Sequence, residues 1–235
     1  MPIYLSTPFY IGAFVLLVII IIILLIISPT QKSFFDLQEY YPILYYNLHK
    51  NEYLYKEIIN EIVNNTGIKR VDIENPLTND KLEWIDYSPK KYSYIRGKVE
   101  ILPIYYQGKF YDNYKYFPKL MNLMQIQPNI LNIYFWKLSS ESALLQHFPK
   151  LTNGNSNIHE SNILDLPILR YTLAINVLTC MEEECSLWVS GHLKKLVFDK
   201  YLLWDPNKEF SLHNDSDTDG DVLFLNIDLK NPFIH

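Results

Sequence analysis

The longest apolar pattern in the chain lies near its amino terminus. Residues 8–27 carry no charged side chain, and residues 11–27 read IGAFVLLVIIIIILLII. A helix of about 20 apolar residues spans the hydrocarbon core of a bilayer. Pro29 follows this run and ends the helix, because proline cannot donate the next backbone hydrogen bond. The pattern predicts one transmembrane helix over 8–27 and a single-pass membrane location.

This segment has two alternative interpretations besides a membrane anchor, namely a cleaved signal peptide and a buried core helix. A signal peptide has a basic start and a shorter apolar run, whereas this start lacks Lys and Arg, and Ile-Ile-Ser-Pro is a poor cleavage sequence. A core helix this uniformly apolar is unusual. The anchor is therefore favoured, but its orientation stays open, because Lys32 is the one basic residue close to it.

Helical periodicity dominates residues 33–67. Leu54, Ile58 and Ile62 follow a three- and four-residue spacing that forms one apolar face. Asn51 is a suitable residue to cap the start of this helix, and Gly67 to end it. The pattern predicts a helical layer that packs against the rest of the protein, within a helical amino-terminal region over 29–98.

Short strands take over from about residue 80. Runs such as KVEILPIYY, NILNIYFWKL, PILRYTLAINVL and DVLFLNIDL are rich in β-branched and aromatic residues, and turn residues separate them. One helix is expected at 116–127, and 151–162 is a polar loop. Many short strands joined by polar turns are typical of a mainly β sandwich or barrel.

Composition excludes several function classes. The chain has 235 residues, with 21 Lys and Arg against 26 Asp and Glu, and this net charge of −5 argues against a nucleic-acid partner. Two cysteines exclude a disulfide-rich scaffold and a four-cysteine zinc site. Cys180 and Cys185 frame the segment CMEEEC, and either a disulfide or two reduced thiols fits this spacing.

Several segments between about 99 and 232 resemble, in order, the aspartyl/asparaginyl β-hydroxylase family. They are LPIYYQGKFYDNYKYFPKLMNLMQIQPNILNIYFWKL, SSESALLQH, LRYTL, LVFDKY, HNDSD and VLFLNID. The resemblance implies a double-stranded β-helix, or jelly roll, over 99–235, after the transmembrane anchor (1–28) and the helical region. It also implies an iron(II)- and 2-oxoglutarate-dependent dioxygenase that hydroxylates a protein or lipid substrate.

The resemblance assigns roles to individual residues. His147 matches the family's metal-binding histidine, and Arg170 matches a position that binds a carboxylate of the cosubstrate. An arginine inside an apolar strand must be paired to be tolerated. A structural ion pair with a carboxylate such as Asp199 is therefore the alternative for Arg170, and a surface histidine is the alternative for His147.

Other positions depart from the family pattern. Trp204 stands at the second metal histidine, and an indole nitrogen cannot bind a metal because it carries a proton. His213 follows an apparent insertion and either completes the metal site or merely precedes a turn. Asp221 replaces a family arginine, and the pair His159-Glu160 offers alternative ligands in a polar loop. Two hypotheses follow: a membrane-anchored dioxygenase, or a catalytically inactive relative that serves as a binding or structural module.

Overall fold

The structure is a computed structural model of the chain, which divides into two compact units, Met1–Lys32 and Ser33–His235. The predicted anchor, His147, the loop at 151–162 and Cys180 lie outside the described residues. Within the described part, no helix is long and apolar enough to cross a membrane. The residues that the structure describes are 32–68, 81–87, 93–146, 167–176, 185–216 and 220–233.

The helices belong mainly to the amino-terminal part of the second unit. Asn51 caps α4 through its side chain, which accepts a hydrogen bond from the Leu54 amide at 3.2 Å, and Gly67 ends the helix with a φ of 68°. Both predicted helix ends are confirmed, as is the helix expected near 116–127. The helical elements are α2 (Leu37–Tyr40), α3 (Pro42–Tyr45), the π-helix η1 (Tyr46–Lys50), α4 (Glu52–Thr66), the 3-10 helix η2 (Asp112–Tyr116) and α5 (Pro118–Ile126).

Two antiparallel sheets make up the rest of this unit. The larger has the order β1-β11-β8-β13-β6-β4-β2, with β5 paired to β4, and the smaller has the order β10-β9-β12-β7-β3. The strands are β1 (Phe34–Phe35), β2 (Ile85–Asp86), β3 (Ser93–Arg96), β4 (Val99–Tyr106), β5 (Lys109–Phe110), β6 (Ile130–Leu138), β7 (Ser142–Gln146), β8 (Ile168–Ala174), β9 (Cys185–Val189), β10 (His192–Lys195), β11 (Tyr201–Trp204), β12 (Phe210–Asn214) and β13 (Val222–Lys230).

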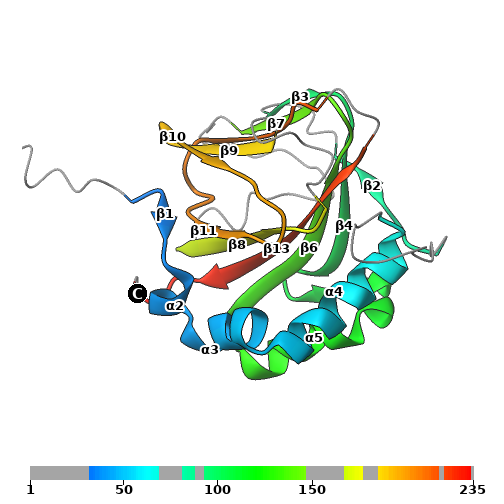
Figure 1. Ribbon diagram of the computed structural model, residues 1–235, viewed down its shortest axis with the longest axis vertical. Helices are drawn as coiled ribbons and strands as arrows, with labels where there is room; N and C mark the ends of the chain where they lie inside the picture. Colours follow the sequence, from blue (N-terminus) through cyan, green and yellow to red (C-terminus); the bar gives the residue numbers. More distant parts are fainter. Residues whose placement is uncertain are drawn as a thin grey trace, which may run out of the picture. The chain divides into compact units, whose positions relative to one another are not determined.

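The last eight strands form a jelly roll. Strands β6, β13, β8 and β11 lie side by side in the larger sheet, and β7, β12, β9 and β10 lie side by side in the smaller one. The chain thus passes repeatedly from one sheet to the other, as it does in a double-stranded β-helix. Figure 1 shows the two sheets facing each other. The predicted mainly β fold with a jelly roll is confirmed.

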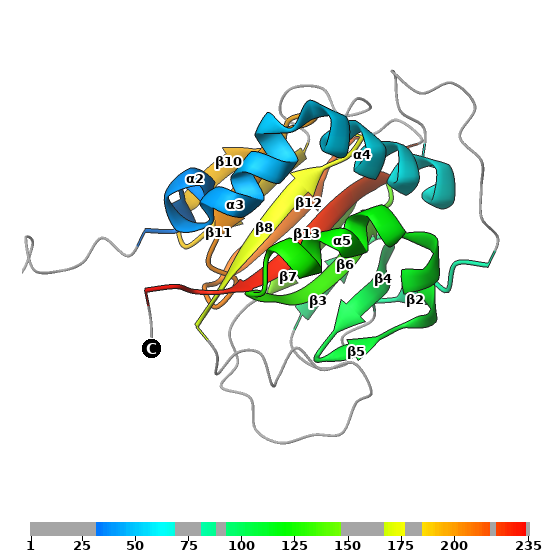
Figure 2. The same ribbon diagram turned by 90° about the horizontal axis from the view of Figure 1, so that it is seen from below.

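The larger sheet is buried on both faces because helices cover its outer side, as Figures 1 and 2 show for α3, α4 and α5. Along β8, Leu169, Tyr171 and Leu173 join the core beneath the helices. The alternate residues, such as Ile168, face the smaller sheet. All seven residues of β8 are therefore buried, and a polar residue that faces inward must find its partners inside the barrel.

Three strands join the sheets from the segment that the sequence assigns to the helical region. β1 pairs with β11, β2 pairs with β4, and β3 pairs with β7. Residues 33–67 are largely helical, as predicted, and the exception is Phe34 and Phe35, which form an edge strand opposite Trp204 and Leu203.

The glycine at the turn between β3 and β4 offers a test of how closely this turn packs against β7. Gly97 has a φ of +69°, and a Cβ at this position would overlap the Ser142 hydroxyl. We expect Gly97→Ala to lower the free energy of unfolding by roughly 1–3 kcal/mol, from backbone strain and the steric clash. Chemical denaturation measures this loss.

The matched control is Gly108→Ala. Gly108 has a similar φ of +76°, but nothing lies within 4 Å of an added Cβ. This variant should show the backbone strain alone, and equal losses in the two variants would contradict the packing role of Gly97.

Candidate functional site

A row of polar side chains crosses the interior face of the larger sheet. Arg170 on β8 and Asp228 on β13 are directly opposite each other, and Asp228 is also opposite Asn132 on β6. Arg170 Nε lies 2.6 Å from Asp228 Oδ1, and its second contact, from Nη2 to Oδ2, is 3.2 Å. Asn132 Nδ2 donates to Asp228 Oδ2 at 2.9 Å. The Asp228 carboxylate is thus held by a two-point ion pair and an amide.

Aromatic rings surround the guanidinium of this pair. The Arg170 Cζ atom lies 4.9 Å from the ring centroid of Trp136, 5.3 Å from that of Trp204 and 5.4 Å from that of Tyr134. An arginine over aromatic faces gains a cation–π attraction that is stronger where water is excluded. Arg170 is 3% exposed and Asp228 is fully buried, so both electrostatic and aromatic contacts hold the arginine in the core.

The expected structural ion pair of Arg170 is present, but its partner differs from the one suggested by the sequence. Asp199 accepts a hydrogen bond from Tyr55 Oη at 2.5 Å instead. Asp228 is opposite Arg170 because β8 and β13 are neighbours in the sheet, although the two residues are 58 positions apart in the sequence. The cosubstrate role of Arg170 stays a prediction.

A second polar row lies next to the first. Trp204 Nε1 donates to Thr172 Oγ1 at 2.9 Å, and Thr172 Oγ1 in turn donates to Asn226 Oδ1 at 2.8 Å. Trp204 is fully buried on β11. The Trp204 indole therefore fills part of the interior and uses its N–H group within the protein.

The end of β7 also meets an aromatic side chain. Gln146, which precedes His147 in the sequence, is opposite Phe210 on β12. Phe210 is 1% exposed, and its ring centroid lies 4.8 Å from that of Trp204 and 6.2 Å from that of Trp136. The β12 side chain at this level is a hydrocarbon, so it offers no ligand atom to a metal bound beside β7.

His213 lies elsewhere on β12. Phe210 and Leu212 join the interior core, and because strand side chains alternate, His213 points to the outer face of the smaller sheet. Its Nε2 lies 2.9 Å from Ser211 Oγ, and its Nδ1 lies 3.7 Å from Asp215 Oδ2. The structure therefore does not bring His213 and Arg170 together.

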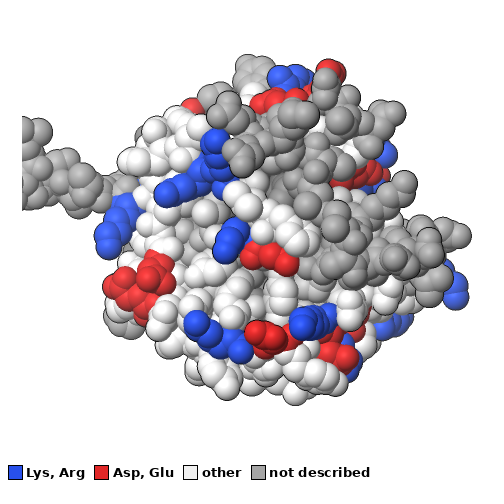
Figure 3. Space-filling view, in the orientation of Figure 1, with Lys and Arg blue, Asp and Glu red and all other residues white. Residues whose placement is uncertain are grey.

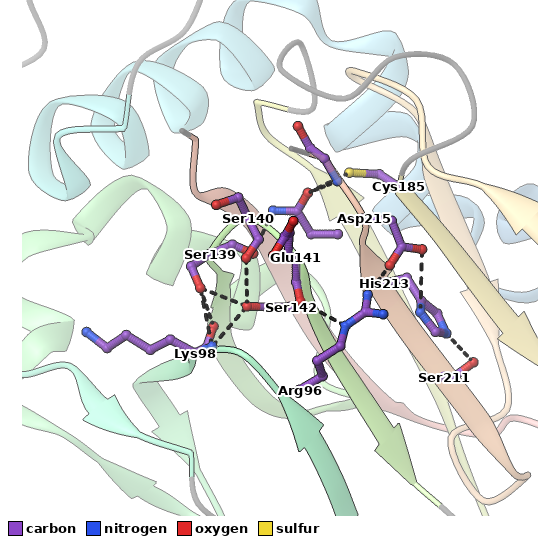
Figure 4. A network of polar contacts seen from close by, with 12 residues as sticks. Arg96, Lys98, Ser139, Ser140, Glu141, Ser142, Cys185, Ser211, His213 and Asp215 are labelled. Carbon is purple, nitrogen blue, oxygen red and sulfur yellow. Dashed lines mark hydrogen bonds and ion pairs between the residues drawn. The ribbon is translucent and has the colours of Figure 1, made fainter. Parts of the chain in front are cut away.

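Figure 4 shows the polar network around His213. Arg96 forms an ion pair with Asp215 and donates from Nε to the Glu141 carbonyl oxygen at 2.9 Å. Burial lowers the pKa of His213, Asp215 opposes this shift, and Arg96 adds to it. The metal role of His213 stays a prediction, and within the described ranges no three His, Cys, Asp or Glu residues form a group that could hold a metal.

The contacts run from Ser211 to His213 and from His213 to Asp215, as they do in a hydrolytic triad, but their geometry does not fit one. The distance of 3.7 Å between the histidine nitrogen and the carboxylate is too long for the hydrogen bond that orients a catalytic imidazole. Arg96 also neutralises Asp215. These residues tie β12 to β3 and the adjoining turn.

Asp221, where the resemblance would place an arginine, is exposed just before β13. Its backbone oxygen accepts a hydrogen bond from Asn176 Nδ2 at 2.8 Å. The carboxylate therefore does not belong to the buried row around Arg170.

A histidine-tyrosine cluster that the sequence did not indicate lies between the helices and the larger sheet. His49, in the π-helix η1, has its Nε2 3.2 Å from Tyr171 Oη, and its ring centroid is 4.1 Å from that of Tyr201. Tyr45 and Tyr55 are further ring neighbours. The cluster includes a residue of a π-helix, an element that is frequent at functional sites and that the structure alone reveals.

The His49 cluster predicts a pH-dependent stability. Burial lowers the pKa of His49 from 6.5 to about 4, Asp199 opposes this shift, and Lys200 adds to it. Between these two pH values the unfolded chain binds a proton that the folded chain does not, so stability is expected to fall as the pH is lowered from 6.5 toward 4. Urea denaturation at several pH values in this range measures the free energy of unfolding. Plotted against pH, this free energy should change less steeply for His49→Gln than for the wild type, and the same slope for both proteins would contradict the assignment.

Cys185, at the start of β9, is disulfide-bonded. The other cysteine of the sequence, Cys180, lies outside the described residues. Of the two alternatives open from the sequence, the structure therefore favours the disulfide.

Comparison with known proteins gives distant structural neighbours. One, described as a predicted oxalate decarboxylase from Thermotoga maritima, is 12% identical with a TM-score of 0.35, over 63% of this chain and 91% of that protein. HygX from Streptomyces hygroscopicus, solved with nickel, 2-oxoglutarate and hygromycin B, is 11% identical with a TM-score of 0.37, over 66% of this chain and 76% of HygX. A cupin 2 conserved barrel domain protein from Rhodopseudomonas palustris is 6% identical with a TM-score of 0.37, over 64% of this chain and 72% of that protein. No protein-family model and no curated protein matches the chain.

Proposed function

We propose that this protein is a membrane-anchored jelly-roll module that has no dioxygenase chemistry and serves as a binding or structural unit. The observation that carries the proposal is the buried pair of Arg170 and Asp228. A cosubstrate carboxylate would have to compete for the arginine with Asp228, which already holds it at two points inside the barrel.

The metal side of the interior supports the same proposal. Phe210 stands opposite the last residue of β7, and Trp204 packs against it. Neither side chain can bind iron(II). The described residues therefore do not fit the iron and 2-oxoglutarate implied by the family resemblance.

The second candidate is the aspartyl/asparaginyl hydroxylase-like dioxygenase itself, acting on a protein or lipid. One observation favours it. Trp136 Nε1 and Asn226 Nδ2 are buried donors that find no acceptor in the part of the chain that the structure describes. Buried donors are normally paired, and a bound acid would supply acceptors.

Calorimetric titration of the full chain in detergent separates the two candidates. The module should bind neither iron(II) under anaerobic conditions nor 2-oxoglutarate in the presence of iron(II). Micromolar binding of 2-oxoglutarate that requires iron(II) would overturn the proposal and favour the dioxygenase. In that case His147→Ala should abolish the binding of iron(II), and His213→Ala would show whether this residue is a second ligand.

A further inference from the structure

The disulfide at the start of β9 bears on the compartment in which the folded unit lies. Cys185 is disulfide-bonded and 2% exposed, and Cys180 is the other cysteine of the sequence. Disulfide bonds form and persist in the lumen of the secretory pathway and outside the cell, and they are rare in the cytosol, where thiols are kept reduced. The bond therefore indicates a folded unit on the luminal or extracellular side of a membrane.

Two asparagines of the chain lie in the acceptor pattern for N-linked glycosylation, a modification made in the secretory pathway. The pattern is Asn-X-Ser/Thr with X other than Pro, and it occurs at Asn64-Asn65-Thr66 and at Asn214-Asp215-Ser216. A pattern this short also arises by chance, so the fold decides which asparagine can carry a sugar. A glycan is bulky and strongly hydrated, and its asparagine must therefore lie on the surface of the folded protein.

Asn64 lies on the outer face of α4. Exposed residues recur along this helix at Lys56, Asn60 and Asn64, and side chains four positions apart lie on one face of a helix. The other face packs in the core, for example through Ile59 and Val63. Figure 3 shows side chains of both charges interspersed over the part of the surface that the helices form. A sugar on Asn64 would extend from this surface into water.

Asn214 is the opposite case. It is fully buried at the end of β12, where it pairs with Cys185 on β9. Its Nδ2, the atom that would bear the sugar, donates to the backbone oxygens of Ser139 at 2.9 Å, Leu138 at 3.2 Å and Gly220 at 3.4 Å. A sugar on this nitrogen would disrupt these hydrogen bonds and would have no room, so a chain modified here could not form this fold.

We propose that the folded unit lies on the luminal or extracellular side of the membrane and carries one N-linked glycan, on Asn64. The disulfide supplies the compartment and α4 supplies the exposed acceptor, and these two observations are independent. The inference rests on the membrane anchor of the proposed function for entry into the secretory pathway. It goes further by giving the folded unit a side of the membrane and a modification site, with or without dioxygenase chemistry in the barrel.

Expression of the full chain in cultured mammalian cells tests the glycan. Treatment with peptide N-glycosidase F should increase the electrophoretic mobility of the wild type by the step of one glycan. Asn64→Gln should remove this step completely, and so should Thr66→Ala, because both destroy the acceptor pattern, whereas Thr66→Ser should keep it. The matched control is Asn60→Gln, the same exchange at an exposed position of α4 that lies outside the pattern.

Mass spectrometry and thiol labelling give the outcomes that would contradict the proposal. The glycosidase converts a glycosylated asparagine to aspartate, and this change should appear at residue 64 and not at 214. In the denatured but unreduced protein, a maleimide should label neither Cys180 nor Cys185. A glycan at 214 instead of 64, or none at all, would overturn the assignment of the site, and two reactive thiols would overturn the compartment.

Alkaline carbonate extraction of the same membranes separates these failures from failure of the anchor. A glycosylated chain released into the supernatant would overturn the anchor but leave Asn64 as the modified residue. An unglycosylated chain that stays in the membrane, with both thiols reactive, would keep the anchor and overturn the orientation. Neither result changes what calorimetry finds for iron(II) and 2-oxoglutarate, so the proposed function fails or stands on its own measurement.

Discussion

Asp228→Asn is expected to destabilise the protein by about 3–5 kcal/mol, because it removes one partner of a buried ion pair. Arg170 would keep its charge in a site where it is 3% exposed, without the carboxylate that now binds it at two points. For a domain of this size the loss corresponds to a fall in melting temperature of roughly 10 °C. Differential scanning calorimetry of the wild type and the variant measures it.

The control removes both charges together. Arg170→Met combined with Asp228→Leu replaces the pair by apolar side chains, and such exchanges are often neutral or stabilising. Asn132 would lose its acceptor on Asp228, a cost of about 1 kcal/mol. The double variant should therefore be more stable than Asp228→Asn. A single variant as stable as the wild type would show that the carboxylate does not hold Arg170 in place.

Trp204→Ala is expected to cost about 3–5 kcal/mol, the usual range for removing a buried aromatic ring. Trp204 is fully buried between Phe210 and the Arg170 guanidinium, and its indole donates to Thr172. The empty space would lie at the centre of the barrel, where side chains from both sheets meet. Chemical denaturation followed by circular dichroism gives the change in the free energy of unfolding.

Trp188 provides a control of the same residue type. It lies on β9, where it alternates with buried residues and is only partly buried. We expect Trp188→Ala to change stability by less than about 1 kcal/mol, as is common for partly exposed positions. Similar losses at the two tryptophans would mean that Trp204 does not have the structural role assigned to it. The milder change Trp204→Phe keeps most of the packing and tests the hydrogen bond to Thr172, which is worth about 1 kcal/mol.

Local signals in the sequence were sufficient for the helices and for the fold class. Asn51 and Gly67 mark the ends of α4 because a side-chain cap and a left-handed residue act within one helical turn. The short strands with polar turns indicate a mainly β protein, since the two-residue alternation is visible without knowledge of the partner strand. The physical cost of a buried arginine likewise indicated that Arg170 needs a carboxylate.

The identity of that carboxylate depended on the tertiary structure. Asp228 meets Arg170 because β13 is inserted between β8 and β6, and neither the neighbour nor the register is encoded near Arg170 in the sequence. The same limit applies to His213, whose direction is fixed by which face of β12 meets the core. Phe34 and Phe35 become a strand only because β11 offers them an edge. Each of these outcomes depends on hydrogen bonds between distant strands, so only the assembled sheets could decide it.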